Sequence, residues 1–470
     1  MSRLLAQIRC HARTQPEKAA LIGDKKTLSY GQLPVLIEER IEILRRNGVH
    51  VAGLQTDNGP DWVLWDIALA AGGFVCVPLP SFFAPAQMQH VLQAAGIDHL
   101  ITAEGLQSTG IKKLSELPYG TSKVTFTSGT TGTPKGVCLP LYGLEQIAES
   151  IVASIGMDYA EQHLSVLPLG ILLENVAGVY SALTAGCTCH LYNLSTLGLA
   201  KPFQPDFGKL AGVLQDKKIT SAILVPELLR GLMGVIAQQK LALPSLKFLA
   251  VGGAKVAPEL VTRARSLGLP VYEGYGLSEC GSVVALNAPG HDMPGTVGKI
   301  LPHVEAITRN GEIIIHNPAF LGYIGAAHKG DFATGDLGRI DENGYLTIEG
   351  RSKNVIITSF GRNISPEWIE SLLLAYHDIA QAVVYGDASP FPAALIVPTQ
   401  LDADITGVVG SVNRALPIYA RLDRFHLVPP FTHQNGLLTA TGRPRREVIF
   451  RQYSSLVIQE KPHDILRSAR

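Results

Sequence analysis

The chain has 470 residues, of which 46% are hydrophobic and 17% charged, and its formal net charge is zero. This length predicts two or three domains with a sizeable core, and the balanced charge does not indicate a surface for nucleic acid or another polyanion. No apolar run reaches the ~18 residues of a membrane-spanning helix, so we expect no transmembrane segment.

The N-terminus and the cysteines favour a cytoplasmic location. Residues 1–13 contain several arginines and lack the long apolar run of a secretory signal. The cysteines are scattered and form no CxxC pair, so in a chain of this size we expect reduced thiols in the core. They are Cys10, Cys76, Cys138, Cys187, Cys189 and Cys280.

The first part of the chain alternates helical and strand patterns, as α/β folds do. Residues 62–70 predict a helix, and residues 73–80 predict a buried strand that a proline ends. Residues 219–226 and 246–253 are further strands that lead directly into a turn. Parallel sheets bind ligands at such strand ends, so a ligand site is expected there.

The pattern changes after about residue 295. Residues 312–316 predict a strand, and Asp341–Gly344 predicts a hairpin turn before a strand at 345–349. An apolar segment follows at 355–357. Ser365 and Pro366 then predict a capped helix start. The apolar face of that helix would consist of Ile369, Leu372, Leu373 and Tyr376.

We place a domain boundary at Arg351–Lys353, where the sequence is short and polar. The expected fold class is α/β, with a large N-terminal domain of packed β-sheets and helices over residues 1–351. A smaller α+β C-terminal domain, expected to be mobile, covers residues 354–470 and follows a hinge near 352–353.

The most informative motif is Val124–Gly136, which reads VTFTSGTTGTPKG. A β-like run ends in a loop rich in glycine, serine and threonine, and Lys135 follows. Glycines let the backbone approach a ligand, free N–H groups bind anions, and hydroxyls and the lysine add donors. The combination predicts a polyphosphate site. It is not a Walker loop, because Pro134 stands where that motif requires glycine.

This loop resembles the phosphate loop of the adenylate-forming superfamily, which includes acyl- and aryl-CoA synthetases, peptide-synthetase adenylation domains and luciferases. Further segments resemble that family's motifs in the same order. They are residues 28–33, 71–78, 275–279, 334–336 and 350–370. The resemblance covers roughly residues 15–450. It implies ATP- and Mg²⁺-dependent activation of a carboxylic acid to acyl-AMP, followed by transfer to coenzyme A.

The resemblance also implies site residues. Tyr275 would stack on adenine, beside Gly252–Ala254, and Asp336 and Arg351 would contact the ribose. Glu279 would hold Mg²⁺, for which an oxygen ligand is suited, and together with Lys135 and Arg443 would form the catalytic set. The implied nucleotide-binding residues are Thr127, Ser128, Gly129, Thr130, Thr131, Gly132, Gly253, Ala254, Tyr275, Gly276, Ser278, Asp336 and Arg351.

The family's second step implies two more positions. After adenylation the small domain rotates about the hinge, at the position of Lys353, and a thiol attacks the acyl-adenylate. Gly361 would belong to the loop that is presented in that step. The thiol is expected to be coenzyme A. The alternative is the phosphopantetheine arm of a freestanding acyl carrier protein, since we expect no fused carrier domain in this chain.

The sequence departs from the family pattern at Arg443. The family's adenylation step uses a lysine in a segment like Thr-x-x-Gly-Lys, and the matching segment here is Leu438–Arg446. Either Arg443 performs the task of that lysine, or adenylation is impaired and the chain is a nucleotide-binding regulatory or assembly subunit. We favour the first alternative, because the other ATP-handling motifs are present and a guanidinium suits phosphate and carboxylate.

A second departure lies at Leu167–Glu174, where many relatives have an aromatic residue or histidine near Ile171. The difference predicts an altered acyl pocket. The apolar run Ile171–Leu173, with Gly178 and Gly186, indicates a hydrophobic acid, either fatty or aryl.

Overall fold

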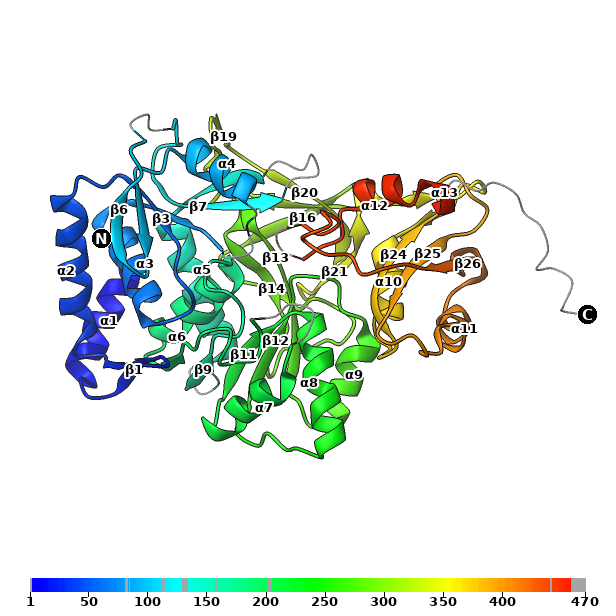
Figure 1. Cartoon of the computed structure of the whole chain (residues 1–470), viewed down its shortest axis with the longest axis horizontal. Helices are drawn as coiled ribbons and strands as arrows, with labels where there is room; N and C mark the ends of the chain where they lie inside the picture. Colours follow the sequence, from blue (N-terminus) through cyan, green and yellow to red (C-terminus); the bar gives the residue numbers. More distant parts are fainter. Residues whose placement is uncertain are drawn as a thin grey trace, which may run out of the picture. The chain divides into compact units, whose positions relative to one another are not determined.

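The computed structural model describes residues 2–80, 83, 85–111, 115–128, 134–156, 159, 161–200, 205–439 and 442–457. The chain divides into two compact units, Met1–Ser352 and Lys353–Arg470. Figure 1 labels the helices and strands of both units. Each unit is described by itself below.

One sheet of the first unit has a parallel centre. Its strands, in spatial order, are β15 (Lys299–Ile300), β14 (Ser282–Leu286), β13 (Val271–Leu277), β12 (Phe248–Val251), β11 (Ser221–Leu224), β9 (Gln162–Leu164), β10 (Thr188–His190), β1 (Ala19–Ile22) and β2 (Thr27–Ser29). The pairs from β10 through β13 are parallel. Their carboxyl ends therefore share one edge of the sheet, where parallel sheets bind ligands.

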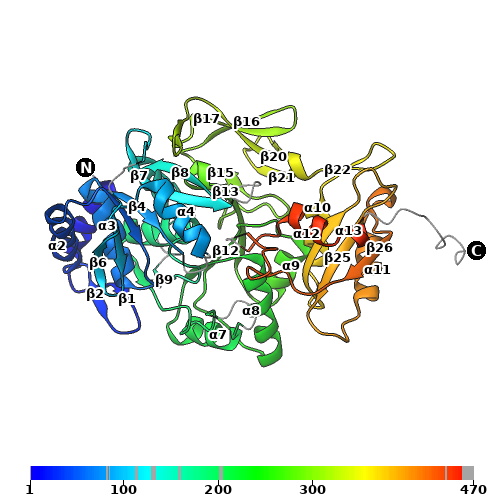
Figure 2. The same cartoon turned by 45° about the horizontal axis from the view of Figure 1, so that its top comes forward.

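A second sheet of the first unit carries the phosphate-loop motif. Its strands, in spatial order, are β19 (Ala326–Ala327), β18 (Gly322–Tyr323), β8 (Pro134–Pro140), β7 (Thr121–Ser128), β4 (Val75–Pro78), β3 (Val51–Leu54), β5 (His99–Thr102) and β6 (Gly105–Ser108). β7 and β8 form an antiparallel hairpin. A third sheet, visible in Figure 2, consists of β16 (Glu305–Arg309), β17 (Glu312–His316), β20 (Phe332–Ile340) and β21 (Leu346–Arg351).

Helices cover the sheets of the first unit and enclose its core. They are α1 (Arg3–Thr14), α2 (Leu33–Arg46), α3 (Pro60–Gly72), α4 (Pro85–Ala95), α5 (Leu141–Ile155), the π-helix η2 (Leu173–Tyr180), α6 (Ser181–Thr184), α7 (Phe207–Asp216), α8 (Pro226–Gln239), α9 (Pro258–Ser266) and the 3₁₀ turn η3 (Ser278–Cys280). α3 begins with a proline and is capped after Gly72 by Gly73, whose φ of 82° is left-handed. Trp62 on α3 is almost fully buried.

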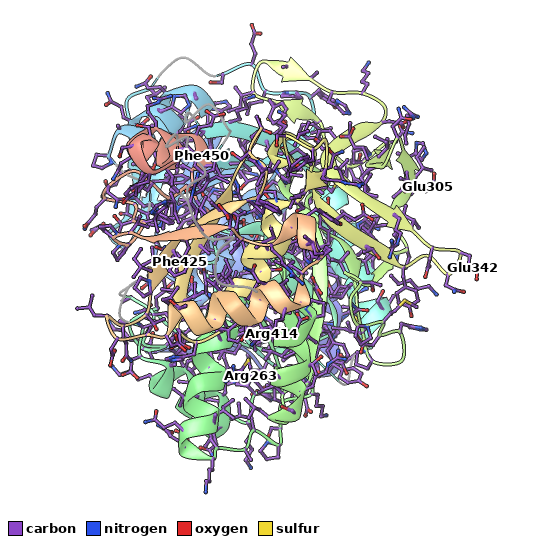
Figure 3. All side chains as sticks on the ribbon, turned by 90° about the vertical axis from the view of Figure 1, so that its right-hand side faces the viewer. Arg263, Glu305, Glu342, Arg414, Phe425 and Phe450 are labelled. Carbon is purple, nitrogen blue, oxygen red and sulfur yellow. The ribbon has the colours of Figure 1, made fainter. Side chains whose placement is uncertain are left out.

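The second unit is built around the sheet of β24 (Ile379–Tyr385), β25 (Ala393–Pro398) and β26 (Arg424–Leu427). Alternate residues of β24 point to opposite faces. Val384 packs with α10 (Pro366–Leu373) and α11 (Ile405–Ala415), whereas Val383 packs on the face of α12 (Arg446–Gln452). Phe425 and Phe450, labelled in Figure 3, contact the first and second of these clusters. The remaining elements are η4 (Ser352–Asn354), β22 (Ile356–Ile357), β23 (Asn363–Ile364), η5 (Ile418–Ala420) and α13 (Ser454–Val457).

The expected fold class is confirmed: the first unit is a mixed α/β structure of several sheets, and the second is a smaller α+β unit. The helix expected at 62–70 is α3, and the strands expected at 219–226 and 246–253 are β11 and β12. The hairpin turn at Asp341–Gly344 is also present, with φ 81° at Gly344.

Two details of the predicted helix at Pro366 were wrong. α10 ends at Leu373, so Tyr376 lies beyond it and is 36% exposed instead of belonging to its apolar face. Ser365 precedes the helix but its side chain does not cap a backbone N–H. Its hydroxyl instead donates to the Oε2 atom of Glu367 at 3.1 Å.

Within the described ranges, no helix is long and apolar enough to cross a membrane.

Candidate active site

The phosphate-loop motif is the connection of the β7–β8 hairpin. Thr127 pairs with Lys135, and Ser128 pairs with Pro134, so the two stems remain in register up to the loop. Lys135 is exposed, whereas its neighbours Pro134 and Gly136 are buried. The predicted nucleotide-binding residues Gly129, Thr130, Thr131 and Gly132 lie outside the described residues.

Neighbouring elements hold both stems of this hairpin. On one side, β18 pairs with β8, and the Ile324 N–H donates to the Gly136 carbonyl oxygen at 3.1 Å. The His90 side chain on α4 contacts both stems. Its Nε2 atom lies 3.1 Å from the carbonyl oxygen of Pro134 on β8, and its ring packs edge to face on Phe126 of β7. The base of the loop is therefore fixed by contacts outside the hairpin.

Lys135 and Glu279, two predicted catalytic residues, meet through a residue that was not predicted. The Tyr323 hydroxyl donates to Oε1 of Glu279 at 3.0 Å. The Lys135 ammonium lies 5.7 Å from the centroid of the Tyr323 ring, within the range of a cation–π contact. Burial, together with the Glu279 charge, raises the pKa of the Tyr323 hydroxyl, so this group remains a hydrogen-bond donor at neutral pH.

A second polar group joins Tyr275, Asp336 and Arg351. The Tyr275 hydroxyl donates to Oδ2 of Asp336 at 2.5 Å, and Nε of Arg351 lies 2.8 Å from Oδ1. Asp336 is buried, and its pairing with Arg351 is fixed by the register of β20 and β21. Each carboxylate oxygen has two lone pairs, so Asp336 can still accept bonds from a ligand hydroxyl. Burial, with Asp336 beside it, raises the pKa of Tyr275.

Glycine occurs at positions 253 and 276 for different structural reasons. Gly253 has φ 79° and, with Ala254, is exposed after β12, where a ligand could reach the backbone. The side chains of Val225 and Leu173 are the nearest to the position of a Cβ on Gly253. At Gly276, by contrast, a Cβ would lie 1.8 Å from the Ser282 carbonyl oxygen. The packing of β13 against β14 therefore requires glycine at 276, whether or not a nucleotide binds.

Sequence comparison identifies the family of this site. Residues 8–124 and 118–319 match the AMP-binding enzyme family, and residues 353–460 match the C-terminal domain of AMP-binding enzymes. The chain belongs to the AMP-binding enzyme family. The recognition made from the sequence motifs is therefore confirmed.

The proteins similar to this AMP-binding enzyme include several CoA ligases. The chain is 27% identical to the long-chain-fatty-acid–CoA ligase FadD15 of Mycobacterium bovis, over 84% of this chain and 85% of that protein. The anthranilate CoA ligase AuaEII in complex with anthranoyl-AMP has a similar fold, with a TM-score of 0.80, 17% identity and coverage of 97% of both chains. The o-succinylbenzoate CoA synthetase of Bacillus subtilis with ATP and magnesium has a TM-score of 0.75, 22% identity and coverage of 94% and 98%.

Arg443 of this AMP-binding enzyme lies in the second unit, on a tight loop. The Thr439 N–H donates to the Arg443 carbonyl oxygen at 2.7 Å, and the Arg443 N–H donates to Oγ1 of Thr439 at 3.0 Å. Gly442 has φ 80°, which the turn requires. Arg446 anchors the segment, because its Nη2 lies 2.5 Å from Oε2 of the buried Glu370. The loop therefore presents an exposed residue 443 from a fixed base.

The two positions implied for the second step also lie in the second unit. Lys353 is part of η4, where this unit begins. Gly361 has φ 70° in the turn between β22 and β23, and its N–H donates to the Thr358 carbonyl oxygen at 2.8 Å. Phe360 beside it is 72% exposed.

The segment Leu167–Glu174 is held by buried polar bonds that sequence patterns did not predict. Oε2 of Glu174 accepts the N–H groups of Val166 at 3.1 Å and Leu167 at 2.9 Å. Oε1 of Glu174 lies 3.2 Å from Nε2 of His163. Asn58 binds the Leu167 carbonyl oxygen. The segment that leads to Ile171 is therefore rigidly positioned.

Gly178 and Gly186, noted above beside the apolar run Ile171–Leu173, have packing roles in the structure. A Cβ on Gly178 would lie 2.4 Å from Oε1 of Glu174, so this glycine makes room for the buried carboxylate. Gly186 has φ 75° and packs against Gln15 and His11. Both glycines serve packing. Leu173 lies beside Gly253 and remains a candidate residue of the acyl pocket.

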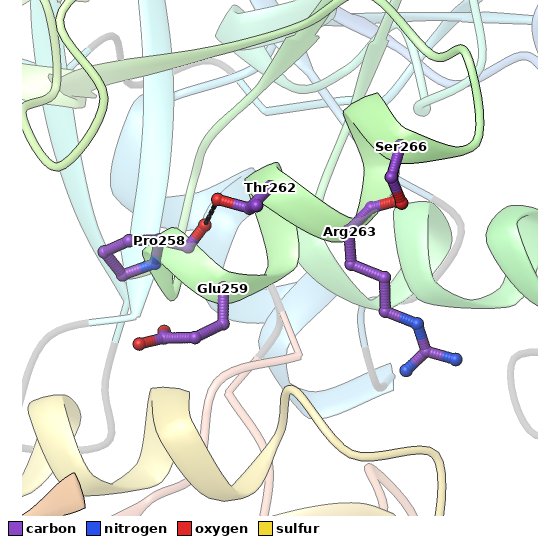
Figure 4. Close-up of a pocket in the computed structure, with 5 residues that line it drawn as sticks. All are labelled: Pro258, Glu259, Thr262, Arg263 and Ser266. Atoms are coloured by element: carbon purple, nitrogen blue, oxygen red, sulfur yellow. Dashed lines mark hydrogen bonds between the residues drawn. The ribbon is translucent and has the colours of Figure 1, made fainter.

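A depression on α9, shown in Figure 4, is separate from these groups. It is lined by Pro258, Glu259, Thr262, Arg263 and Ser266. The Thr262 hydroxyl donates to the Pro258 carbonyl oxygen at 3.0 Å, and the Ser266 hydroxyl donates to that of Arg263 at 2.8 Å. These hydroxyls bond their own helix, so the depression does not present converging polar groups to a ligand.

Proposed function

We propose that this AMP-binding enzyme is an ATP- and Mg²⁺-dependent acid–thiol ligase that converts a carboxylic acid to acyl-AMP and then to acyl-CoA. The observation that carries the proposal is the arrangement of two polar groups in one unit. Lys135 and Glu279 meet through Tyr323, and Asp336 joins Tyr275 and Arg351. A cation and a carboxylate at a glycine-rich hairpin suit a metal polyphosphate, and a buried carboxylate suits a ribose diol.

The nucleotide would be held from both groups. The N–H groups of the β7–β8 connection and the ammonium of Lys135 would bind the phosphates. Asp336 would accept the ribose hydroxyls, while Arg351 holds that carboxylate in place. Tyr275 would lie against adenine, with its hydroxyl fixed on Asp336, and the exposed backbone after β12 at Gly253 and Ala254 would line the base. Ser278 begins the turn that carries Glu279.

The residues present fit a magnesium ion that is bound together with ATP. Among the described residues, no cluster of three or more histidine, cysteine, aspartate or glutamate side chains could hold a metal. Magnesium in such sites uses one or two carboxylates together with substrate phosphates and water. Glu279 provides one carboxylate, of which the Oε1 atom is bonded to Tyr323. Bound there, the ion would neutralise charge on the phosphates.

The reaction would proceed in two balanced steps. A carboxylate oxygen of the acid attacks the α-phosphorus of ATP, the bond from that phosphorus to the bridging oxygen of the β-phosphate breaks, and pyrophosphate leaves. Arg443 would stabilise the charge that develops on the carboxylate and α-phosphate. In the second step a thiolate sulfur attacks the acyl carbonyl carbon, and AMP leaves. Lys353 would lie at the hinge for the change between steps, between domains 1–351 and 354–470, and Gly361 in the loop presented to the thiol.

The acid is proposed to be fatty or aryl. Leu173 and Val225 lie around Gly253, so apolar groups surround the position next to the nucleotide. The named substrates of the relatives, long-chain fatty acids and anthranilate, are of these classes. The absence of an aromatic residue or histidine at Ile171 distinguishes this chain from many relatives.

Two alternatives differ in a measurable step. The acceptor could be the phosphopantetheine thiol of a freestanding acyl carrier protein, which leaves adenylation unchanged. In the other alternative, Arg443 does not replace the family lysine, and the chain is a nucleotide-binding regulatory or assembly subunit.

We place the enzyme in the cytoplasm, a location supported by its six cysteines, all of which are free.

The test is pyrophosphate release from ATP and Mg²⁺ with medium-chain, long-chain and aromatic acids, each with and without CoA. Acid-dependent release with CoA-dependent turnover supports the ligase and identifies the acid class. Acid-dependent release with turnover only on a phosphopantetheinylated carrier protein supports the first alternative. Protein that binds ATP but releases no pyrophosphate with any acid class supports the second.

A further inference from the structure

Tyr323 occupies a particular place between two groups of the proposed site. Its hydroxyl bonds to Glu279, from η3, and its ring face receives the ammonium of Lys135, from β8. Tyr323 itself lies on β18, a two-residue strand that pairs with β8 at Val137. One side chain therefore contacts a cation and a carboxylate from two separate elements.

The backbone fixes the position of Tyr323 independently of these contacts. Gly322 pairs with Cys138 and has φ 120°, and a Cβ there would lie 2.2 Å from the Ala326 carbonyl oxygen. The Tyr323 ring also packs edge to face on Phe320, with centroids 5.1 Å apart. Because strand pairing and ring packing already hold the side chain, its hydroxyl can act as a fixed reference point for Glu279.

The bond from Tyr323 restricts the carboxylate. Glu279 has three side-chain torsions and is only half-buried, so without a partner its carboxylate would sample several orientations. A donor at Oε1 leaves Oε2 as the oxygen available to an incoming cation. Outer hydrogen bonds of this kind orient metal-binding carboxylates and affect metal affinity strongly.

We propose that Tyr323 is a positioning residue for magnesium-bound ATP: its hydroxyl orients Glu279 toward the metal, and its ring holds Lys135 toward the phosphates. The inference rests on the proposed function, because it needs an ATP–Mg²⁺ site at this place. It assigns two separable tasks to one side chain. The hydroxyl serves the metal, and the ring serves the lysine.

Two substitutions separate these tasks. Tyr323→Phe removes the hydroxyl and keeps the ring, whereas Tyr323→Leu removes both. Tyr142→Phe is the matched control, because Tyr142 is 58% exposed on α5 and belongs to neither polar group. Binding of ATP to each full-length variant is measured by titration calorimetry, once with excess Mg²⁺ and once with EDTA. Thermal unfolding of each variant shows whether it is folded.

The expected result is a selective loss. Tyr323→Phe should reduce the gain in ATP affinity that Mg²⁺ provides by about tenfold, with affinity in EDTA unchanged within twofold. Tyr323→Leu should also reduce affinity in EDTA, by about two- to fivefold. If the folded Tyr323→Phe variant gains as much ATP affinity from Mg²⁺ as the wild-type protein, the inference about the hydroxyl is overturned. If Tyr323→Leu and Tyr323→Phe bind ATP in EDTA with equal affinity, the inference about the ring is overturned. Failure of the proposed function would differ, because wild-type protein would then show no magnesium-dependent ATP binding or no pyrophosphate release.

Discussion

The imidazole Nε2 of His90 lies 3.1 Å from the carbonyl oxygen of Pro134, the residue at which β8 leaves the proposed phosphate loop. A carbonyl only accepts hydrogen bonds, so Nε2 carries the proton in this contact. His90 thereby connects α4 to the base of the loop. Nothing in the sequence pattern of residues 85–95 indicated this role, because a single histidine on a helix is more often a packing residue.

Replacing His90 should weaken ATP binding and leave acid binding unchanged. We expect His90→Ala to raise the KM for ATP about two- to tenfold, the range of one lost hydrogen bond, with the KM for the acid unaltered. Steady-state pyrophosphate release at varied ATP checks this. His90→Gln keeps an N–H donor and should recover most of the loss. Equal increases in both KM values would mean that the contact supports only the general fold.

Arg443 should be required for adenylation and replaceable by lysine. Removing a positioned charge from the developing transition state costs on the order of 10²–10³ in rate, so Arg443→Ala should slow acyl-AMP formation by that factor. Arg443→Lys should retain activity within about tenfold of wild type. Single-turnover formation of acyl-AMP is the measurement. Thioester formation from supplied acyl-AMP is the control, and unchanged pyrophosphate release by Arg443→Ala would contradict the assigned role.

The buried pair of Lys123 and Asp66 should be essential for stability. Nζ of Lys123 lies 2.7 Å from Oδ1 of Asp66, and both side chains are almost fully buried. The hydroxyl of Tyr180 and the amide of Asn175 bond to the same carboxylate. Lys123→Met leaves Asp66 buried without its cation, so we expect a loss of about 3–5 kcal/mol in the free energy of unfolding.

Denaturant unfolding of Lys123→Met measures that loss. The double variant Lys123→Met with Asp66→Asn removes both charges and should recover part of it, because a neutral amide needs no cation. A double variant as unstable as the sum of both single variants would show that the two residues act independently.

Glu273 should make folding stability fall as pH rises. Burial raises the pKa of this carboxyl from an ordinary 4.5 to about 8, although Lys255 nearby opposes the change. Between these values the unfolded chain has lost the proton while the folded chain keeps it, so stability decreases from about pH 4.5 to pH 8 and then levels off. Replacement by glutamine removes this dependence.

The stability difference between Glu273→Gln and wild type should therefore grow with pH, in favour of the variant. The maximum is on the order of 5 kcal/mol, from the difference between the two pKa values. Denaturant unfolding at a series of pH values between 4.5 and 9 measures it. A constant difference across this range would mean that Glu273 titrates at its ordinary pKa.

The sequence points to those residues of the proposed site that occur in motifs, and it does not point to those that only the fold brings nearby. Lys135 and Glu279 were each expected to be catalytic, because each lies in a motif with its own local pattern. Tyr323 was missed, because a Gly-Tyr pair in a two-residue strand has no periodicity.

The positions of Lys135 and Glu279 could be predicted because each lies in a motif that is recognisable by itself. Their common partner could not be predicted, because only the pairing of β18 with β8 brings Tyr323 between them. The same holds for the segment before Ile171. A π-helix and a buried Glu174 have no sequence signature comparable to a glycine-rich loop, so the sequence did not predict that Gly178 leaves space for that carboxylate.

The conformation of the loop that carries Arg443 does not depend on the side-chain charge of residue 443. Its closing bonds use the backbone N–H and carbonyl of residue 443, which any residue other than proline provides, and its anchor is the side chain of Arg446. A change from lysine to arginine at 443 can therefore occur in evolution without rebuilding the loop. The proposed catalytic cation can be exchanged at this position while the scaffold stays the same, so activity can be tuned there independently of stability.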